Sequence, residues 1–244
     1  MHRADKRSAA QVAASPLTRG RGRPRKDTSS SVSTRELILE SAGKLFAANG
    51  YASTSVSDIA TEAGIQQSSV YYYFDNKEAI LRSSSSINRD SLSFAAELSQ
   101  RSDDVHLRLY DLLYYDTLHL CNSPLDFNEV ERLAEADPKD FSDFWDDYRK
   151  LRDITSGLVV EGVANGIFRP CDEDLVACAM LSLNEGLQKR YRTQEGHSYD
   201  SDNPFVVPSR SPGDYAGLSA ITSLRSVVVE QDVLRSLEHR IPVI

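Results

Sequence analysis

The polar and apolar residues follow a helical period over most of the chain from residue 33 onward. Apolar residues recur three and four positions apart, as on one face of an α-helix, and there is no sustained period-two alternation of the kind that indicates strands. The first helix begins at Ser33, where Ser33-Thr34-Arg35-Glu36 has the order of a capping box, and it ends at Asn49-Gly50. The pattern therefore predicts an all-α protein.

Two short helices follow, separated by a tight turn. The first begins at a second capping box, Ser55-Val56-Ser57-Asp58, and Gly64 ends it, while the next spans residues 67–73. Two short helices joined by a three- to four-residue turn that contains glycine form the helix-turn-helix pattern. Asp75-Asn76 then caps a long fourth helix.

The remaining chain is predicted to be helical, with about nine helices in all. The helix expected at residues 138–165 has an apolar stripe that is broad enough for a central, buried position. Residues 193–210 are polar and contain Gly196, Pro204 and Pro208, so we expect a long loop there. The four helices predicted beyond residue 82 cover residues 103–121, 138–165, 172–192 and 212–240.

Charge is distributed unevenly along the chain. The 244 residues carry a formal net charge of −8, but residues 1–35 hold nine basic and two acidic side chains, which leaves −15 on the rest. Residues 1–33 contain almost no large apolar side chain and cannot bury enough surface to offset the entropy of ordering, so we expect a disordered basic arm. A basic arm on an acidic body indicates a polyanionic partner.

The composition also excludes several classes of protein. The longest apolar run, Leu175–Leu181, has seven residues, far fewer than the roughly 20 needed to cross a bilayer. No apolar segment precedes Pro16, which argues against a secretory signal. Cys121, Cys171 and Cys178 lack metal-ligand spacing, and phosphate loops, nucleophile elbows and HExxH motifs are missing. We expect a cytoplasmic protein that is not an enzyme, contacts no membrane and needs no metal or cofactor.

The segment from Glu36 to Leu81 resembles the DNA-binding domain of the tetracycline-repressor-like (TetR) family of bacterial regulators. The resemblance covers about a fifth of the chain. It implies a helix-turn-helix domain at residues 34–81 and an effector-binding and dimerisation domain at residues 82–244, with the arm at residues 1–33 outside both. The matching runs are Ile38-Leu39-x-x-Ala42-x-x-Leu45-Phe46, Gly50-Tyr51-x-x-Thr54-Ser55-Val56-x-Asp58-Ile59-Ala60 and Ala63-Gly64-Ile65-x-x-x-Ser69-x-Tyr71-x-Tyr73-Phe74-x-Asn76-Lys77-Glu78-x-Ile80-Leu81.

The resemblance implies a set of DNA-contacting residues around the third helix. A helix that enters the major groove needs short polar and aromatic side chains on its outer face. Gln67 can pair with an adenine edge, and tyrosine hydroxyls can donate to phosphates. Packing of Tyr71 or Tyr73 against the first helix is the alternative. The full set is Ser57, Gln67, Ser68, Ser69, Tyr71, Tyr72, Tyr73 and Lys77; Ser68 stands where many members have glycine or proline, and Tyr73 where histidine is common.

The predicted DNA-binding domain itself is not basic, since residues 36–83 carry a net charge of −3. The arm segment Arg19-Gly-Arg-Gly-Arg-Pro-Arg-Lys26 resembles an AT-hook, a Gly-Arg-Pro core that lies along an A·T-rich minor groove. Such a groove is narrow and its negative potential attracts arginine. We expect Arg21, Arg23 and Arg25 to contact DNA, with a nonspecific solubilising tail as the alternative.

The resemblance further implies that the last two helices form a four-helix bundle with a second copy, and that middle helices enclose an effector pocket. Small residues such as Ala179, Gly186, Gly217 and Ala220, together with Leu224, would allow close approach. A dimer would present two recognition helices to successive major grooves of a palindromic operator. Pocket candidates combine aromatic walls with a few polar groups, although core packing is the alternative for each: Tyr110, Tyr114, His119, Phe144, Trp145, Tyr148, Arg152 and Glu185.

These features predict a sequence-specific transcriptional regulator of a bacterial cytoplasm, associated with the nucleoid, that binds double-stranded DNA as a homodimer. Repression, relieved by a small-molecule effector, is the family default, although activation stays open. A looser resemblance to the AmtR nitrogen-control branch implies a protein effector instead, which could engage residues 193–210. An architectural DNA-binding protein is a further alternative.

Overall fold

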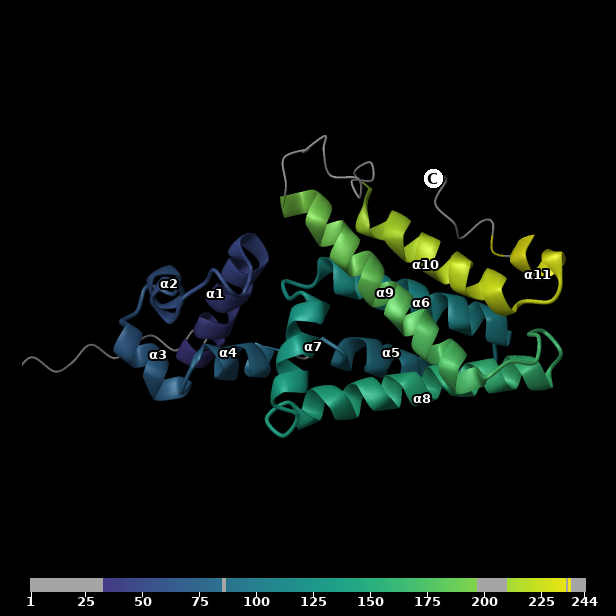
Figure 1. Cartoon of the computed structure of the whole chain (residues 1–244), viewed down its shortest axis with the longest axis horizontal. Helices are drawn as coiled ribbons and strands as arrows, with labels where there is room; N and C mark the ends of the chain where they lie inside the picture. The colour runs from purple at the N-terminus through teal and green to yellow at the C-terminus, as the bar shows by residue number, and fades with distance from the viewer. Residues whose placement is uncertain (1–32, 85–86, 197–209, 236, 238–244) are drawn as a thin grey trace, which may run out of the picture. The chain divides into compact units, whose positions relative to one another are not determined.

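The computed structural model describes residues 33–84, 87–196, 210–235 and 237. Within these residues the secondary structure is helical apart from one isolated antiparallel bridge between Phe168 and Val228, which confirms the all-α prediction (Figure 1). None of the helices in this part of the chain is both long and apolar enough to cross a membrane. The eleven helices are α1 (Thr34–Asn49), α2 (Val56–Glu62), α3 (Gln67–Tyr73), α4 (Lys77–Ser84), α5 (Arg89–Ser99), α6 (Val105–Asn122), α7 (Phe127–Ala136), α8 (Ser142–Ala164), α9 (Glu173–Gly196), α10 (Pro212–Val227) and α11 (Gln231–Arg235).

Reciprocal side-chain caps fix where the first two helices begin. The Ser33 hydroxyl accepts a hydrogen bond from the Glu36 N–H at 3.2 Å, and the Ser33 N–H donates to the Glu36 carboxylate at 2.8 Å. Ser55 and Asp58 repeat this arrangement at α2. Each box satisfies backbone groups that a helix leaves unpaired at its N-terminus. Both predicted capping boxes are therefore confirmed.

Several predicted boundaries were wrong. The fourth helix ends at Ser84 and is short, while α5 and α7 were not predicted as separate helices. Helix α7 is strongly amphipathic, and the Asp126 side chain caps it by accepting from the Asn128 N–H at 2.9 Å. Helix α9 continues to Gly196, four residues beyond its predicted end at Arg192, and the rest of the predicted loop, residues 197–209, lies outside the described part of the chain.

The last predicted helix ends at Val227 instead of continuing to Arg240. Val228 leaves the helix for an extended conformation, in which the Val229 N–H donates to the Ile167 carbonyl at 3.1 Å. The Arg169 N–H donates to the Val227 carbonyl at 2.8 Å. Three consecutive β-branched valines favour this extended pairing over helix, and the short α11 follows.

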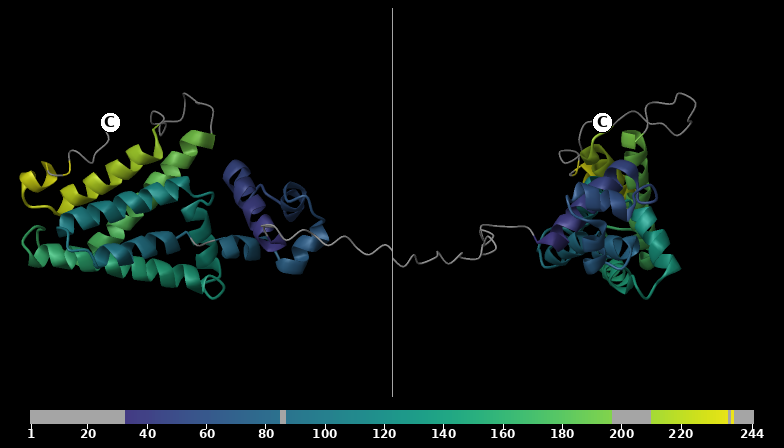
Figure 2. Two further views of the ribbon diagram at one scale, coloured as in Figure 1. Left: turned by 180° about the vertical axis from the view of Figure 1, so that it is seen from behind. Right: turned by 90° about the vertical axis from the view of Figure 1, so that its left-hand side faces the viewer.

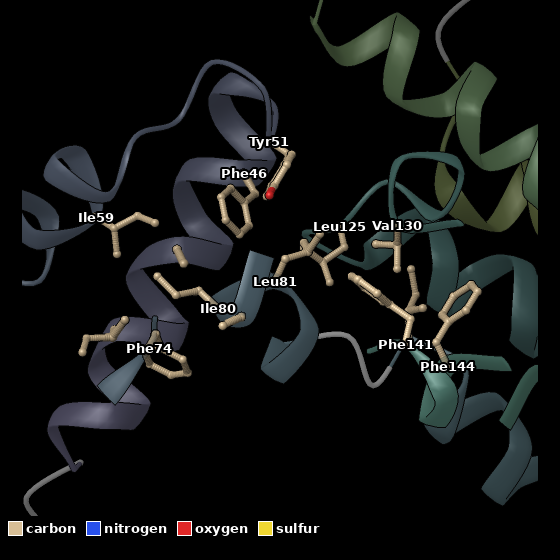
Figure 3. Packing of buried hydrophobic residues seen from close by; sticks show 14 of the residues in the cluster. Phe46, Tyr51, Ile59, Phe74, Ile80, Leu81, Leu125, Val130, Phe141 and Phe144 are labelled. Atoms are coloured by element: carbon tan, nitrogen blue, oxygen red, sulfur yellow. The ribbon is translucent and has the colours of Figure 1, made fainter. Parts of the chain in front are cut away.

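The apolar residues form two large clusters, which share α8. The first joins α1–α4 to α7 and the start of α8, where Leu81 lies close to Leu125, Val130 and Phe141 (Figure 3). The second fills the space between α6, α8, α9 and α10. Both views show α6 alongside α10, with α9 crossing between them and α8 (Figures 1 and 2). The central helix is thus α6, and α8, predicted to be central, keeps one polar face in solvent.

Candidate DNA-binding interface and effector site

A small apolar core holds the two helices of the helix-turn-helix. Val70 and Phe74 anchor α3, and Ile59 anchors α2, all with buried side chains. Gly64 has a φ of 65°, in the left-handed region that favours glycine, and this allows the sharp turn. The Ile65 N–H then donates to the Ala60 carbonyl at 3.0 Å. The turn therefore fixes α3 against α2 with its outer face free.

That outer face carries an exposed row of tyrosines. Tyr72 is 82% exposed, and its ring lies edge-on to Tyr73 with the centroids 5.0 Å apart. Tyr71 and Tyr73 are 49% and 41% exposed, so packing against α1 does not bury either ring. Neighbouring large apolar surfaces left in solvent are typical of a binding site. Of the other predicted contact residues, Ser57, Gln67 and Ser68 are exposed on the same helix pair and Ser69 is half-buried.

Lys77 has a structural role that the sequence did not reveal. Its ammonium donates to the carbonyls of Tyr51 and Thr54, at 2.7 and 2.8 Å, and lies 4.1 Å from the centroid of the Tyr51 ring. These contacts tie the start of α4 to the loop before α2. An ammonium has three hydrogens, and these two hydrogen bonds occupy two of them.

The other basic side chains of this domain also have protein partners. Arg35 lies over the Phe74 ring, 5.2 Å from its centroid, and Lys44 forms an ion pair with Glu40 at 2.8 Å. Arg82 forms an ion pair with Asp140. The predicted contacts Arg21, Arg23 and Arg25 lie outside the described residues.

Four of the predicted effector residues lie together. Phe144, Trp145 and Tyr148 on α8 form an aromatic cluster with Phe127, which had not been predicted; the Tyr148 and Phe127 centroids are 5.9 Å apart. Glu185 on α9 lies near the Tyr148 hydroxyl, and its buried Oε1 has no hydrogen-bond partner within the described part of the chain. Burial raises the pKa of Glu185 to about 7, and the neighbouring carboxylates of Glu131 and Asp116 act in the same direction, while the Tyr148 hydroxyl opposes them.

The other predicted effector residues lie elsewhere. Tyr110 and Tyr114 stack on each other, with centroids 6.0 Å apart, and Tyr114 faces Gly213 on α10. His119 stacks on Tyr115 and approaches Asp90 across 3.7 Å. Arg152 forms an ion pair with the adjacent Asp153. The eight predicted residues therefore do not line a single site.

A buried polar network connects three helices. It was not predicted from the sequence. Fully buried Asp116 on α6 accepts a hydrogen bond from the Asn184 amide at 2.7 Å, and Asn184 accepts one from the Ser219 hydroxyl on α10. Burial raises the pKa of Asp116, which the hydrogen bond from Asn184 opposes. One turn along α9, the Gln188 amide donates to the carbonyls of Leu120 and Leu125. Asn184 and Gln188 are two amide residues four positions apart on an otherwise apolar face of α9, and this pattern could have indicated the network from the sequence.

Two further surfaces stand out. A groove of about 950 Å³ lies between α1 and the ends of α6 and α9, and includes buried Cys121 in its lining. On α9 and α10, Leu175 and Leu218 are exposed and the Cα of Gly186 faces open space. Ala220 and Leu224, expected to approach a partner, instead lie in the core of their own chain.

Comparison with known proteins identifies a matching family model, relatives in sequence and a similar solved structure. The family model for bacterial regulatory proteins of the tetR family matches residues 38–83. YhgD of Bacillus subtilis, an HTH-type transcriptional regulator, is 25% identical over 164 residues, which cover 63% of this chain and 81% of YhgD. IcaR of Staphylococcus aureus, the negative transcriptional regulator of the biofilm operon icaADBC, is 26% identical over 130 residues, or 46% of this chain and 70% of IcaR. The crystal structure of Mycobacterium smegmatis AmtR is similar over 90% of this chain and 99% of AmtR, with a TM-score of 0.61 and 26% identity.

Proposed function

Because this chain belongs to the TetR family of bacterial regulatory proteins and is a DNA-binding transcriptional regulator, we propose that it represses transcription from a palindromic operator, which it binds as a homodimer. The observation that carries the proposal is the exposed row Tyr71-Tyr72-Tyr73 on a helix fixed by a buried helix-turn-helix core. Similarity to IcaR, a negative regulator, supports repression. This function requires access to the chromosome, so the proposal includes a cytoplasmic location with the nucleoid.

In this proposal α3 enters the major groove. The helix presents neutral groups to the bases: the Gln67 amide can form two hydrogen bonds with an adenine edge, and the tyrosine rings can contact thymine methyl groups. Hydroxyls of Tyr72 and Tyr73 reach phosphates, which fix position without reading sequence. Direct base contacts would thus provide specificity from one short helix.

A second copy of the chain would supply the other half-site. The exposed face of α9 carries Leu175, Cys178, Ala179, Ser182 and Gly186, a mostly small and weakly polar surface. Such a surface allows two helices to pack closely. On α10 the outward positions include Leu218, so this face would complete the contact. The two recognition helices would then lie roughly 34–36 Å apart.

Release by an effector completes the proposed function. The cluster of Phe144, Trp145, Tyr148 and Glu185 combines one buried and two half-buried aromatic rings with one buried carboxyl group, as small-ligand sites do. An effector that prefers one arrangement of the dimer lowers DNA affinity by its differential binding free energy. A protein effector, which the looser resemblance to the AmtR branch implies, is the second candidate.

Footprinting of the purified protein on genomic fragments, including its own promoter region, tests this function. We expect one protected palindrome on specific fragments. Tyr72→Ala should weaken that protection about tenfold or more, since it removes a whole ring from the interface. Val160→Ala, which truncates an exposed side chain on α8 far along the chain, is the control. Featureless protection by the unaltered protein would contradict the proposal.

A further inference from the structure

The carboxyl group of Glu185 differs from the other buried charged groups of the folded chain. Its Oε1 is buried and has no hydrogen-bond partner within the described residues. Buried Arg108, by contrast, forms an ion pair with Glu161, and buried Asp116 accepts a hydrogen bond from the Asn184 amide. Burying a polar atom without a partner costs free energy, so such an atom requires an explanation. A ligand that supplies the partner is one explanation.

The charged groups around Glu185 are other carboxyls. Its pKa is raised chiefly by burial and further by the carboxylates of Glu131 on α7 and Asp116 on α6, while the Tyr148 hydroxyl on α8 opposes them. Burial and the neighbouring Glu135 also raise the pKa of Glu131. In the part of the chain that the structure describes, no ion pair joins Glu185 or Glu131 to a lysine or arginine. Carboxyl groups without a protein cation favour a ligand that carries positive charge.

Aromatic rings form the rest of the site. The rings of Trp145 and Tyr148 are half-buried and nearly perpendicular, at 88°, with their centroids 6.3 Å apart. Buried Phe144 packs against both, with its centroid 5.0 Å from that of Trp145 and 6.5 Å from that of Tyr148. The Trp145 indole N–H donates to the Ala134 carbonyl on α7 at 3.2 Å, which holds the ring in place. The faces of tryptophan and tyrosine rings attract cations through their quadrupoles.

We propose that the aromatic cluster and Glu185 bind an organic cation, a substituted ammonium group whose charge pairs with the Glu185 carboxylate while its carbon substituents contact the rings. The proposal rests on the effector site proposed above and gives the chemical class of its ligand. Aromatic rings beside a carboxylate suit a quaternary ammonium group. A hard metal ion requires several oxygen ligands, which rings do not supply, and the surrounding carboxyls would repel an anion.

Trp145 reports on this site directly, because it is the one tryptophan of the chain. The test titrates the full-length protein with benzyltrimethylammonium and with benzyl alcohol, a neutral molecule with the same ring, and follows tryptophan fluorescence. We expect saturable binding of the cation and binding of the alcohol that is about tenfold or more weaker. Because the pKa of Glu185 is about 7 and only its ionised form pairs with the cation, affinity for the cation should rise about tenfold from pH 6 to pH 8.

Two variants separate the carboxylate from the rings. Glu185→Gln keeps the shape of the side chain and removes its charge, so it should bind the cation about tenfold or more weakly and lose the pH dependence. Its affinity for benzyl alcohol should stay the same. Glu97→Gln makes the same substitution at an exposed position on α5 and is the matched control. Circular dichroism verifies that both variants are folded.

Three results would overturn the proposal. These are equal affinities for the cation and the alcohol, no binding of the cation, and equal affinity for the cation in folded Glu185→Gln and the unaltered protein. The titrations contain no DNA, so none of these results rejects operator binding, which footprinting tests separately. Binding of the cation as expected, with operator protection unchanged when it is added, would support the ligand class and reject release by that ligand.

Discussion

The carboxylate of Glu129 on α7 accepts a hydrogen bond from the backbone N–H of Tyr51, with 3.3 Å between Oε2 and N. Tyr51 lies just after α1, and its ring packs 5.2 Å from that of Phe46. A second polar link, between Arg82 and Asp140, joins α4 to the segment between α7 and α8. Helices α1–α4 are therefore attached to α7 and to the segment that follows it by one polar contact each, beside a shared apolar cluster (Figure 3).

Removing the Glu129 acceptor is expected to loosen this attachment. Glu129→Ala leaves the Tyr51 N–H unpaired in a partly buried position and should lower the free energy of unfolding by roughly 1 kcal/mol. Glu129→Gln keeps an acceptor oxygen and should lose less than half as much. Urea unfolding followed by circular dichroism measures both. Equal losses in the two variants would show that the hydrogen bond contributes nothing specific.

Lys77 provides a second prediction, because its contacts separate a structural role from a phosphate contact. Lys77→Met keeps the side-chain stem but removes the donor for the Tyr51 and Thr54 carbonyls. We expect the free energy of unfolding to fall by about 1–3 kcal/mol without any DNA present. Lys44→Met, which removes an exposed ion pair, should change it by less than 1 kcal/mol. If Lys77→Met has normal stability but binds DNA more weakly, Lys77 acts only as a phosphate contact and the structural role is rejected.

The sequence predicted best where structure depends on local chemistry. The capping boxes at Ser33 and Ser55 and the glycine turn at Gly64 depend on residues a few positions apart, and the structure confirms them. The sequence predicted the structure poorly where contacts between residues far apart in the chain determine it. Val228 ends α10 because a strand-like partner at Phe168 is available, 60 residues away.

The candidate sites divide in the same way. The outer face of α3 follows from helical spacing, so the exposure of its tyrosines could be expected. The partners of Lys77 and the grouping of Tyr148 with Glu185 depend on how helices far apart in sequence pack. Aromatic composition alone could not tell Tyr110, which is core, from Tyr148.

Gly162 on α8 is required by a close contact with Phe168, and this gives a third prediction. A Cβ at position 162 would lie 2.0 Å from Cδ2 of the Phe168 ring. Gly162→Ala should therefore destabilise the protein by about 1–3 kcal/mol or more, because the buried ring must move. Gly157→Ala on the same helix meets nothing within 4 Å and should stabilise it by up to about 1 kcal/mol. Thermal unfolding of the two variants shows whether each substitution lowers or raises the melting temperature. A similar shift of the melting temperature in both variants would contradict the packing argument.

Glu185 should make stability depend on pH. Its pKa is raised from the ordinary value of 4.5 to about 7, chiefly by burial, so the folded protein binds its proton more tightly than the unfolded chain does. Between these two values the folded state holds more protons, and the free energy of unfolding must fall as pH rises from about 4.5 to 7. Glu185→Gln keeps an acceptor for the Tyr148 hydroxyl and cannot ionise. It should match the unaltered protein near pH 4.5 and exceed its stability by roughly 3 kcal/mol at pH 8. Glu97→Gln, which makes the same substitution at an exposed position on α5, is the matched control. Chemical denaturation at pH 4.5, 6 and 8 measures the difference, and a constant offset between Glu185→Gln and the unaltered protein would show that Glu185 does not titrate in this range.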